Sequence, residues 1–213
     1  MNKINKFLTA IAVVVLHVGA NATVVNASNS GWYRNTGSSN GTEGNTCAGC
    51  GSGGYRNWLG FNLTSFSGTV TSATLSIFSD AKNNPNQQIN WYDVSTTYSA
   101  LGTSSAAIYT DLGAGSILAS DVQNPGIYNN FALNSIGLAN LTSALGGFWA
   151  VGGSNVTGGD AFGWNVGVTT NAAFYQLDIQ TIASANVPEP ESIALVGLAL
   201  AILVMTSRKA KKA

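Results

Sequence analysis

Apolar and polar residues alternate with a period of two along three stretches of the chain. The apolar positions are Leu59, Phe61 and Leu63, then Ala73, Leu75 and Ile77, then Tyr175, Leu177 and Ile179. Successive strand residues point to opposite faces of a sheet, so this pattern predicts strands that are buried on one face and exposed on the other.

Further strands are predicted for residues 88–95, 106–112, 127–133, 147–151 and 161–168. Clusters of Gly, Asn, Asp and Pro between them indicate turns. Residues 135–145 have apolar positions at helical spacing and predict one short helix across an end of the fold. The pattern predicts an all-β fold, an antiparallel β-sandwich of jelly-roll-like type, over residues 55–186. Residues 28–54, rich in Gly, Ser and Asn, are interpreted as a loose N-terminal arm or a long loop.

The first 27 residues have the parts of a secretory signal. Lys3 and Lys6 precede an apolar run over residues 7–18. Small residues in a cleavage-like pattern follow at Ala20-Asn21-Ala22 and again at Val25-Asn26-Ala27. The apolar run is too short to span a membrane stably. We expect a signal helix that directs export through the Sec machinery and is removed after the first or the second pattern.

The last 27 residues, 187–213, contain three parts in order. Val187, Pro188, Glu189 and Pro190 come first, an apolar run from Ile193 to Met205 follows, and the basic tail holds Arg208, Lys209, Lys211 and Lys212. A terminal apolar segment followed by basic residues is typical of a stop-transfer helix with its positive end in the cytoplasm. A permanent tail anchor is the alternative, although the run is short for a bilayer.

These three parts resemble the PEP-CTERM sorting signal of Gram-negative bacteria, with Pro188-Glu189-Pro190 as the signature. The resemblance implies exosortase, a transpeptidase-like membrane enzyme, as a partner that cuts near the motif. As with a GPI signal, the mature protein then keeps no spanning helix. The implied location is transient anchoring in the membrane, followed by the cell surface or the extracellular space.

Two stretches of the body, residues 58–63 and 68–77, resemble the opening strands of secreted bacterial β-sandwiches of the DNRLRE and carbohydrate-binding-module-like type. Gly152-Gly153 is similar to a block that many PEP-CTERM proteins carry late in their bodies. This resemblance implies a fold and no chemistry.

Charge is scarce and unevenly distributed. Only 8% of residues are Asp, Glu, Lys or Arg, whereas ordinary globular proteins have roughly 25%. Six of the nine basic residues lie at the two ends, and residues 23–186 hold three basic and seven acidic residues, a net charge of −4. This composition argues against a coiled coil, a charged disordered tail and a nucleic-acid binder.

Candidate chemistry is sparse as well. The only histidine, His17, lies in the predicted signal, which excludes a Ser-His-Asp triad and a His-ligated zinc site in the body. An acid pair for glycoside hydrolysis stays open, but most acids fall at predicted turns, where turn chemistry explains them. We expect no enzyme activity and no cofactor, with a structural Ca²⁺ as the alternative.

Cys47 and Cys50 are the only cysteines. Zinc needs four ligands, and Gly51 stands where covalent haem attachment requires His. In an oxidising compartment we expect a short-loop disulfide, with thiol exchange with a surface partner as the alternative.

Tryptophan residues supply candidate binding positions. Trp58, Trp91 and Trp164 are candidate carbohydrate contacts, because exposed rings beside amide side chains can stack on sugars. The alternative is that these indoles fill the core.

The leading hypothesis is a non-enzymatic exported protein of the envelope or extracellular matrix, associated with exopolysaccharide or biofilm. The alternatives are a specific carbohydrate-binding module and a hydrolase that uses an Asp pair.

Overall fold

The structure is a computed structural model that describes residues 20–41, 45–51, 54–162 and 174–182. Trp164 and the whole C-terminal signal, from Val187 to Lys212, lie outside the described residues. The chain divides into two units, residues 1–183 and 184–213, and the second lies entirely outside the described residues. No helix in the described part of the chain is long and apolar enough to cross a membrane.

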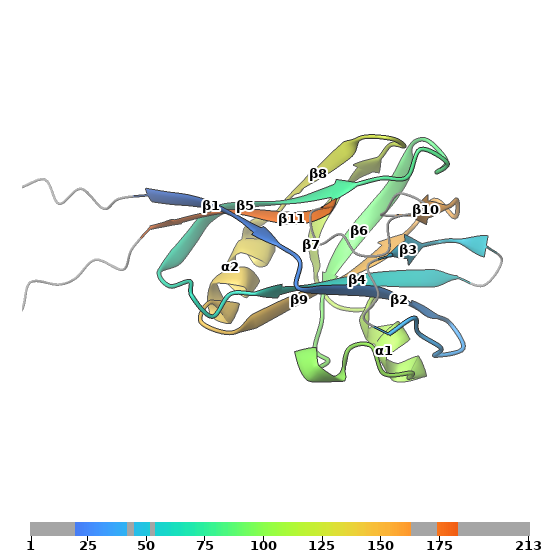
Figure 1. Cartoon of the computed structure of the whole chain (residues 1–213), viewed down its shortest axis with the longest axis horizontal. Coiled ribbons are helices and arrows are strands. Elements are labelled where there is room, and N and C mark those ends of the chain that lie inside the picture. The colour runs from blue at the N-terminus through green and yellow to red at the C-terminus, as the bar shows by residue number, and fades with distance from the viewer. Residues whose placement is uncertain (1–19, 42–44, 52–53, 163–173, 183–213) are drawn as a thin grey trace, which may run out of the picture. The chain divides into compact units, whose positions relative to one another are not determined.

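Two antiparallel sheets face each other and confirm the predicted all-β sandwich (Figure 1). In spatial order, sheet A consists of β1 (Ala20–Asn26), β11 (Tyr175–Ile182), β5 (Thr69–Phe78) and β8 (Tyr128–Ala132). In the same way, sheet B consists of β2 (Asn29–Arg34), β4 (Tyr55–Asn62), β9 (Phe148–Asn155), β6 (Gln87–Asp93) and β7 (Ile117–Gln123). A short pair joins β3 (Cys47–Ala48) to β10 (Ala161–Phe162).

The main core lies between the two sheets. The apolar side of every alternating stretch predicted from the sequence is buried there, as for Leu59 and Phe61 on β4, Leu75 on β5 and Leu177 on β11. Fully burying one such side chain contributes about 1.5–3 kcal/mol relative to leaving it exposed. The alternation therefore identifies the core-facing side of these strands correctly.

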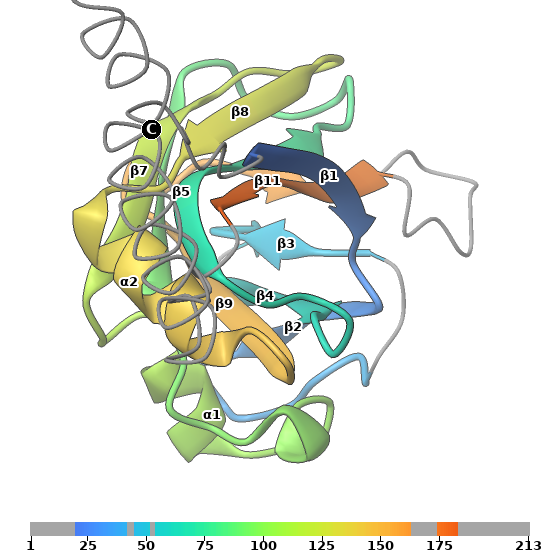
Figure 2. The same ribbon diagram turned by 90° about the vertical axis from the view of Figure 1, so that its left-hand side faces the viewer.

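Sheet B is also covered on its other face. The segment between β6 and β7 crosses this face and carries η4 (Tyr98–Ala100) and α1 (Ala106–Asp111), as Figure 2 shows. A second buried cluster forms beneath it from Tyr33, Trp58, Leu101, Ile108 and Leu112. Because of this cover, sheet B has apolar residues on both faces, whereas the outer face of sheet A is polar.

Helix α2 (Ser135–Ala144) confirms the predicted helix at residues 135–145. It contacts β5 of sheet A and both β7 and β9 of sheet B, so it closes one side of the sandwich (Figure 2). Asn134 caps its start by accepting a hydrogen bond from the backbone N–H of Gly137 at 2.9 Å. Leu141 is completely buried in the main core.

Two predictions about local structure are wrong. Residues 106–111 form α1 rather than the strand predicted for 106–112, because Ile108 and Leu112, the residue just after the helix, are four residues apart and reach the second cluster from one side. Residues 28–54 are not simply a loose arm, because β2 pairs with β4 over six residues. Tyr33 anchors this strand: its hydroxyl donates to the Thr103 carbonyl at 2.9 Å and accepts from the Gly102 N–H at 2.7 Å.

The other predicted strands have mixed outcomes. Residues 88–95, 127–133 and 147–151 correspond to β6, β8 and β9. Of residues 161–168, only the first two lie in the described part of the chain, and they form β10. Strand β7 was not predicted, and β1 lies within the stretch predicted as an export signal.

Candidate functional site

Two of the three tryptophans predicted as sugar contacts, Trp58 and Trp91, do not present ring faces to solvent. Trp58 is 1% exposed in the second cluster and Trp91 is 0% exposed in the main core. The prediction for these two residues is therefore wrong, because both strands are packed on the face from which the indole projects. Trp164 lies outside the described residues, so the same prediction for it stays open.

Cys47 and Cys50 are joined by a disulfide, with Cα atoms 5.9 Å apart. Both side chains are buried, beside the pairing of β3 with β10. A buried disulfide is shielded from an attacking thiolate, which favours the structural interpretation over thiol exchange with a partner. Within the described residues, no three His, Cys, Asp or Glu side chains lie close enough together to hold a metal ion.

The outer face of sheet A carries a regular array of short, mainly polar side chains. They form three cross-strand rows, consisting of Asn26, Gln176, Ser76 and Asn130, then Val24, Asp178, Thr74 and Ala132, then Ala22, Gln180 and Ser72. Neighbouring strands lie about 4.8 Å apart, so the rows form a nearly regular grid. We call these eleven residues the polar face; Asp178 is its only charged member.

Side chains of the polar face contact one another along the first row. Gln176 Nε2 donates to Asn26 Oδ1 at 3.4 Å, and Ser76 Oγ donates to Asn130 Oδ1. Asn26 and Asn130 are exposed at the two ends of this row. The row thus places the amide groups of Asn26, Gln176 and Asn130 along one line of the sheet surface.

Three aromatic rings border one end of the polar face. Phe78 lies across from Tyr128 in the strand register, with ring centroids 5.3 Å apart. On the other side, the ring of Phe174 lies 5.2 Å from that of Phe78. Tyr128 is 45% exposed. The border adds an apolar strip to a surface that otherwise offers hydrogen-bonding groups.

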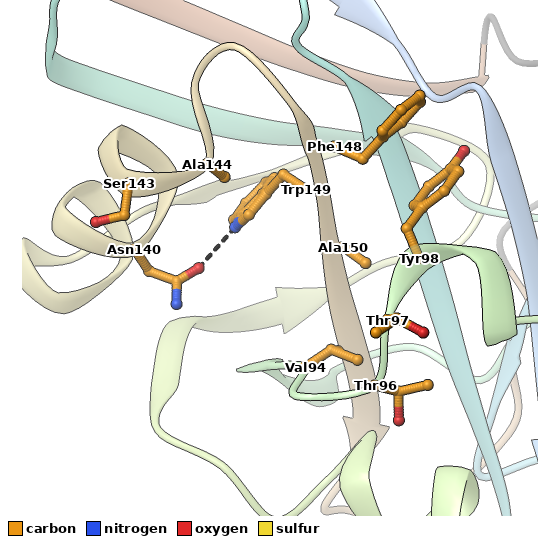
Figure 3. Close-up of a pocket in the computed structure, with 10 residues that line it drawn as sticks. All are labelled: Val94, Thr96, Thr97, Tyr98, Asn140, Ser143, Ala144, Phe148, Trp149 and Ala150. Atoms are coloured by element: carbon orange, nitrogen blue, oxygen red, sulfur yellow. Dashed lines mark hydrogen bonds between the residues drawn. The ribbon is translucent and has the colours of Figure 1, made fainter.

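A shallow groove of about 300 Å³ lies on the outer side of sheet B, next to α2 (Figure 3). Its walls come from the segment after β6, from α2 and from the start of β9. The lining residues are Val94, Thr96, Thr97, Tyr98, Asn140, Ser143, Ala144, Phe148, Trp149 and Ala150. The lining holds no Asp, Glu, His, Lys or Arg side chain, and it offers hydrogen-bonding groups and aromatic rings.

Phe148 and Tyr98 form the aromatic wall of this groove. Their rings are stacked, with centroids 4.6 Å apart and planes 22° from parallel, and Phe148 is 50% exposed. The Tyr98 hydroxyl accepts from Asn29 Nδ2 at 2.9 Å and bonds Ser28 Oγ at 2.7 Å. The Tyr98 ring lies directly over Gly60, where a Cβ atom would collide with it. A larger residue at this position would therefore displace the Tyr98 ring from the wall.

Asn140 forms the opposite wall, and its orientation is determined by Trp149. The indole Nε1 donates to Asn140 Oδ1 at 2.7 Å, as the dashed line in Figure 3 shows. The carbonyl oxygen of the amide is therefore engaged, and the NH₂ group points away from the indole (Figure 3). This arrangement gives the groove a donor opposite the exposed Phe148 ring.

Asp111 holds the third wall in place. Its carboxylate accepts hydrogen bonds from the backbone N–H and the hydroxyl of both Ser95 and Thr96, at 2.7–3.2 Å. Partial burial raises the pKa of Asp111, but the hydrogen bonds from Ser95 and Thr96 outweigh it, so that the pKa lies below its usual value.

The substitution Asp111→Asn is expected to lower the free energy of unfolding by about 1–2 kcal/mol at pH 7, because an amide accepts fewer of these bonds and bears no charge. The folded-state pKa is depressed, so this contribution is complete above the unfolded pKa of about 3.9 and is lost as the pH falls through the folded value. Urea unfolding at pH 7 and at pH 2 measures it. We expect the difference between wild type and variant to shrink at pH 2; an equal difference at both pH values contradicts the role of the charge.

The polar face and the groove are not predicted by the pattern of residues along the chain. A signal for part of the groove existed, since alternation along residues 148–151 puts Phe148 on the side opposite Trp149 and Val151. The ring that stacks on Phe148 is that of Tyr98, which lies on the crossing segment 50 residues earlier in the chain. A local periodicity does not predict a contact between residues so far apart.

Comparison with known proteins adds no family assignment, since neither a protein-family model nor a curated protein matches this chain.

Proposed function

We propose that this protein is a non-enzymatic, exported component of the cell envelope or extracellular matrix, and that it binds neutral polysaccharide through the polar face. The observation that carries the proposal is the grid of amide and hydroxyl groups with one carboxylate, bordered by three aromatic rings. Sugar hydroxyls both donate and accept hydrogen bonds, and such a grid offers both kinds of partner.

Weak contacts suffice for such a surface. One hydrogen bond contributes about 0.5–1.5 kcal/mol net, and a polymer chain that crosses several rows makes many of them at once. Aromatic rings contribute further where a sugar face lies on them. The net charge of −4 over residues 23–186 disfavours acidic polymers. The proposed ligand is therefore a neutral polysaccharide chain.

We further infer a jelly-roll topology for the sandwich. The strand pairs are nested along the chain: β1 pairs with β11, β4 with β9, β5 with β8 and β6 with β7. This nesting describes a long hairpin rolled into two sheets, with β2 added at an edge. Jelly rolls include lectin domains, which supports the proposal by analogy of fold alone.

Cosedimentation tests the proposal with the exported protein recovered from cells. The probes are regenerated cellulose, the producing cells' own extracellular polysaccharide and, as an acidic comparison, calcium alginate. We expect saturable binding to at least one of the first two and weaker binding to alginate. Absence of binding to both cellulose and the native polysaccharide contradicts the proposal.

Paired variants locate the binding surface. The double variant Gln176→Ala/Gln180→Ala removes two amides of the central strand and is expected to weaken binding about tenfold, since each lost bond is worth about 0.7 kcal/mol. The matched control, Asn35→Ala/Gln88→Ala, removes two amides belonging to sheet B or its turns. An equal loss in both double variants contradicts a specific role of the polar face.

A specific carbohydrate-binding module is the second candidate function, and the groove favours it. Phe148 and Asn140 offer a ring and a donor across a space that can hold one sugar residue. On this alternative, Phe148→Ala weakens binding about three- to tenfold, given stacking of about 0.5–1.5 kcal/mol. Val156→Ala, at a side chain that is 55% exposed elsewhere, is the control. If Phe148→Ala alone reduces binding, the ligand lies in the groove rather than on the polar face.

Sorting of the C-terminus is part of the proposal and rests on the order of motif, apolar run and basic tail in residues 187–213. We propose that residues 193–205 form a transient hydrophobic helix and that exosortase cuts near Pro188-Glu189-Pro190. Intact mass of the protein from membranes and from medium tests this. A mature chain that ends near Pro190 supports it, and one that still carries Arg208 to Lys212 indicates a permanent anchor.

A further inference from the structure

Strand β1 lies inside the segment predicted as an export signal. It pairs with β11 over seven residues, from Ala20 opposite Ile182 to Asn26 opposite Gln176. The chain then crosses to the other sheet: the N–H of Ala27 donates to the Tyr175 carbonyl and that of Ser28 to the Gly60 carbonyl, each at 2.8 Å. This segment therefore connects both sheets of the sandwich.

Part of this segment belongs to the core. Ala27 is 3% exposed and is a member of the main core, and Val25 packs against the same cluster. Before Val25, in contrast, Asn21 and Ala22 are exposed. The burial thus begins at Val25, between the two bonds that the patterns mark for cleavage, after Ala22 and after Ala27.

The two patterns have different consequences for the fold. A cut after Ala27 removes all of β1 and leaves β11 as an unprotected edge strand, with unpaired N–H and C=O groups along it. A cut after Ala22 keeps Thr23, Val24, Val25 and Asn26, each still opposite its partner on β11. Both cuts fit the usual length of a secretory signal of about 15–30 residues, so only the tertiary structure distinguishes them.

We propose that the peptidase that removes export signals cleaves between Ala22 and Thr23, and that the mature protein begins with Thr23 as the outer strand of sheet A. This inference rests on the proposed export of the protein. The step consumes one water molecule: the Ala22–Thr23 amide bond breaks, Ala22 becomes the carboxyl end of the released signal, and the Thr23 nitrogen becomes the new α-amino group.

The N-terminus of the mature protein tests the proposal directly. The full chain is expressed in a Gram-negative host, and the exported fraction is analysed by N-terminal sequencing and intact mass. We expect a chain that starts at Thr23. A chain that starts at Ser28 overturns this inference and leaves export intact, whereas a chain that retains Met1 in the cytoplasm overturns export and the cleavage site together.

Matched variants test which bond is cut. Ala22→Leu puts a large residue directly before the proposed bond, at an exposed position, and is expected to abolish the product that starts at Thr23. Asn21→Leu, at the neighbouring exposed position that the pattern leaves free, is the control and is expected to keep it. If Ala22→Leu still yields the wild-type N-terminus, the proposed site is wrong.

Stability provides an independent measurement. Two otherwise identical chains, one starting at Thr23 and one at Ser28, are exported behind the same foreign signal and compared by thermal unfolding. We expect the Thr23 chain to unfold cooperatively and the Ser28 chain to melt on the order of 10 °C lower or to be degraded, since a loss of several kcal/mol shifts a domain of this size by about that much. Equal melting temperatures overturn the structural argument for the site.

Discussion

Replacement of Trp91 by alanine is expected to lower the free energy of unfolding by about 3–5 kcal/mol, among the largest effects of any single change in this protein. Trp91 is fully buried between the sheets, and its ring meets that of Phe131 edge-on, with centroids 5.8 Å apart. On the neighbouring strand, Gly153 lies opposite Trp91 and leaves room for the indole. Alanine would leave a cavity that this strand cannot fill. Urea unfolding followed by circular dichroism measures the loss.

Trp91→Phe is the matched variant. It keeps a ring in the core and removes the indole Nε1–H, which is buried without a hydrogen-bond partner. An unpaired buried donor destabilises a fold, so its removal offsets part of the lost volume. We expect Trp91→Phe to cost less than half as much as Trp91→Ala. Equal costs would mean that the N–H has a stabilising partner.

Gly152→Ala is expected to destabilise the protein by about 3 kcal/mol, at the upper end of what overpacking costs. A Cβ atom at Gly152 would lie 2.5 Å from the carbonyl oxygen and 2.6 Å from the Cα of Leu112. Both are backbone atoms just after α1, so no side-chain rotation relieves the collision. The segment over sheet B must move away, and we expect thermal unfolding at a lower temperature and faster proteolysis within residues 94–115.

Gly147→Ala is the control for this substitution. A Cβ atom there would lie 3.5 Å from the nearest atom, the Ala144 carbonyl oxygen, which is an ordinary contact. We expect a change within about 0.5 kcal/mol. If Gly152→Ala is tolerated as well as Gly147→Ala, the segment that carries α1 does not pack on sheet B as described. The Gly-Gly block noted in the sequence is thus explained by close packing on both faces of β9.

The sequence predicted the strands whose two faces differ in polarity. Along β5 and β11 one face meets the core and the other meets solvent, so residues such as Leu75 and Leu177 alternate with polar neighbours. The helix at residues 135–145 was predicted for a related reason, because only one of its faces is buried. On β4 the core-facing side of Leu59 and Phe61 was predicted as well, but a second layer covers the other face, and the pattern did not predict the buried cluster that Trp58 joins there.

The binding surfaces depend on contacts that no local pattern encodes. A row of the polar face brings together Asn26, Ser76, Asn130 and Gln176, which lie on four strands and are up to 150 residues apart. From the sequence one could see only that the chain is rich in Ser, Thr and Asn, and not which of these residues lie side by side. Conversely, Trp58 and Trp91, which were predicted as sugar contacts, are large apolar side chains. The hydrophobic effect buries such side chains when a core is available.

The sequence by itself determined the two-faced strands, the short helix at residues 135–145 and the two cleavage patterns near Ala22 and Ala27, because each is a property of neighbouring residues. Only the tertiary structure decided that residues 106–111 are helical, that Trp58 and Trp91 are buried, and that Val25 packs against the core. The physical reason is that burial depends on which strand becomes a neighbour, and strand pairing here joins residues from opposite ends of the chain.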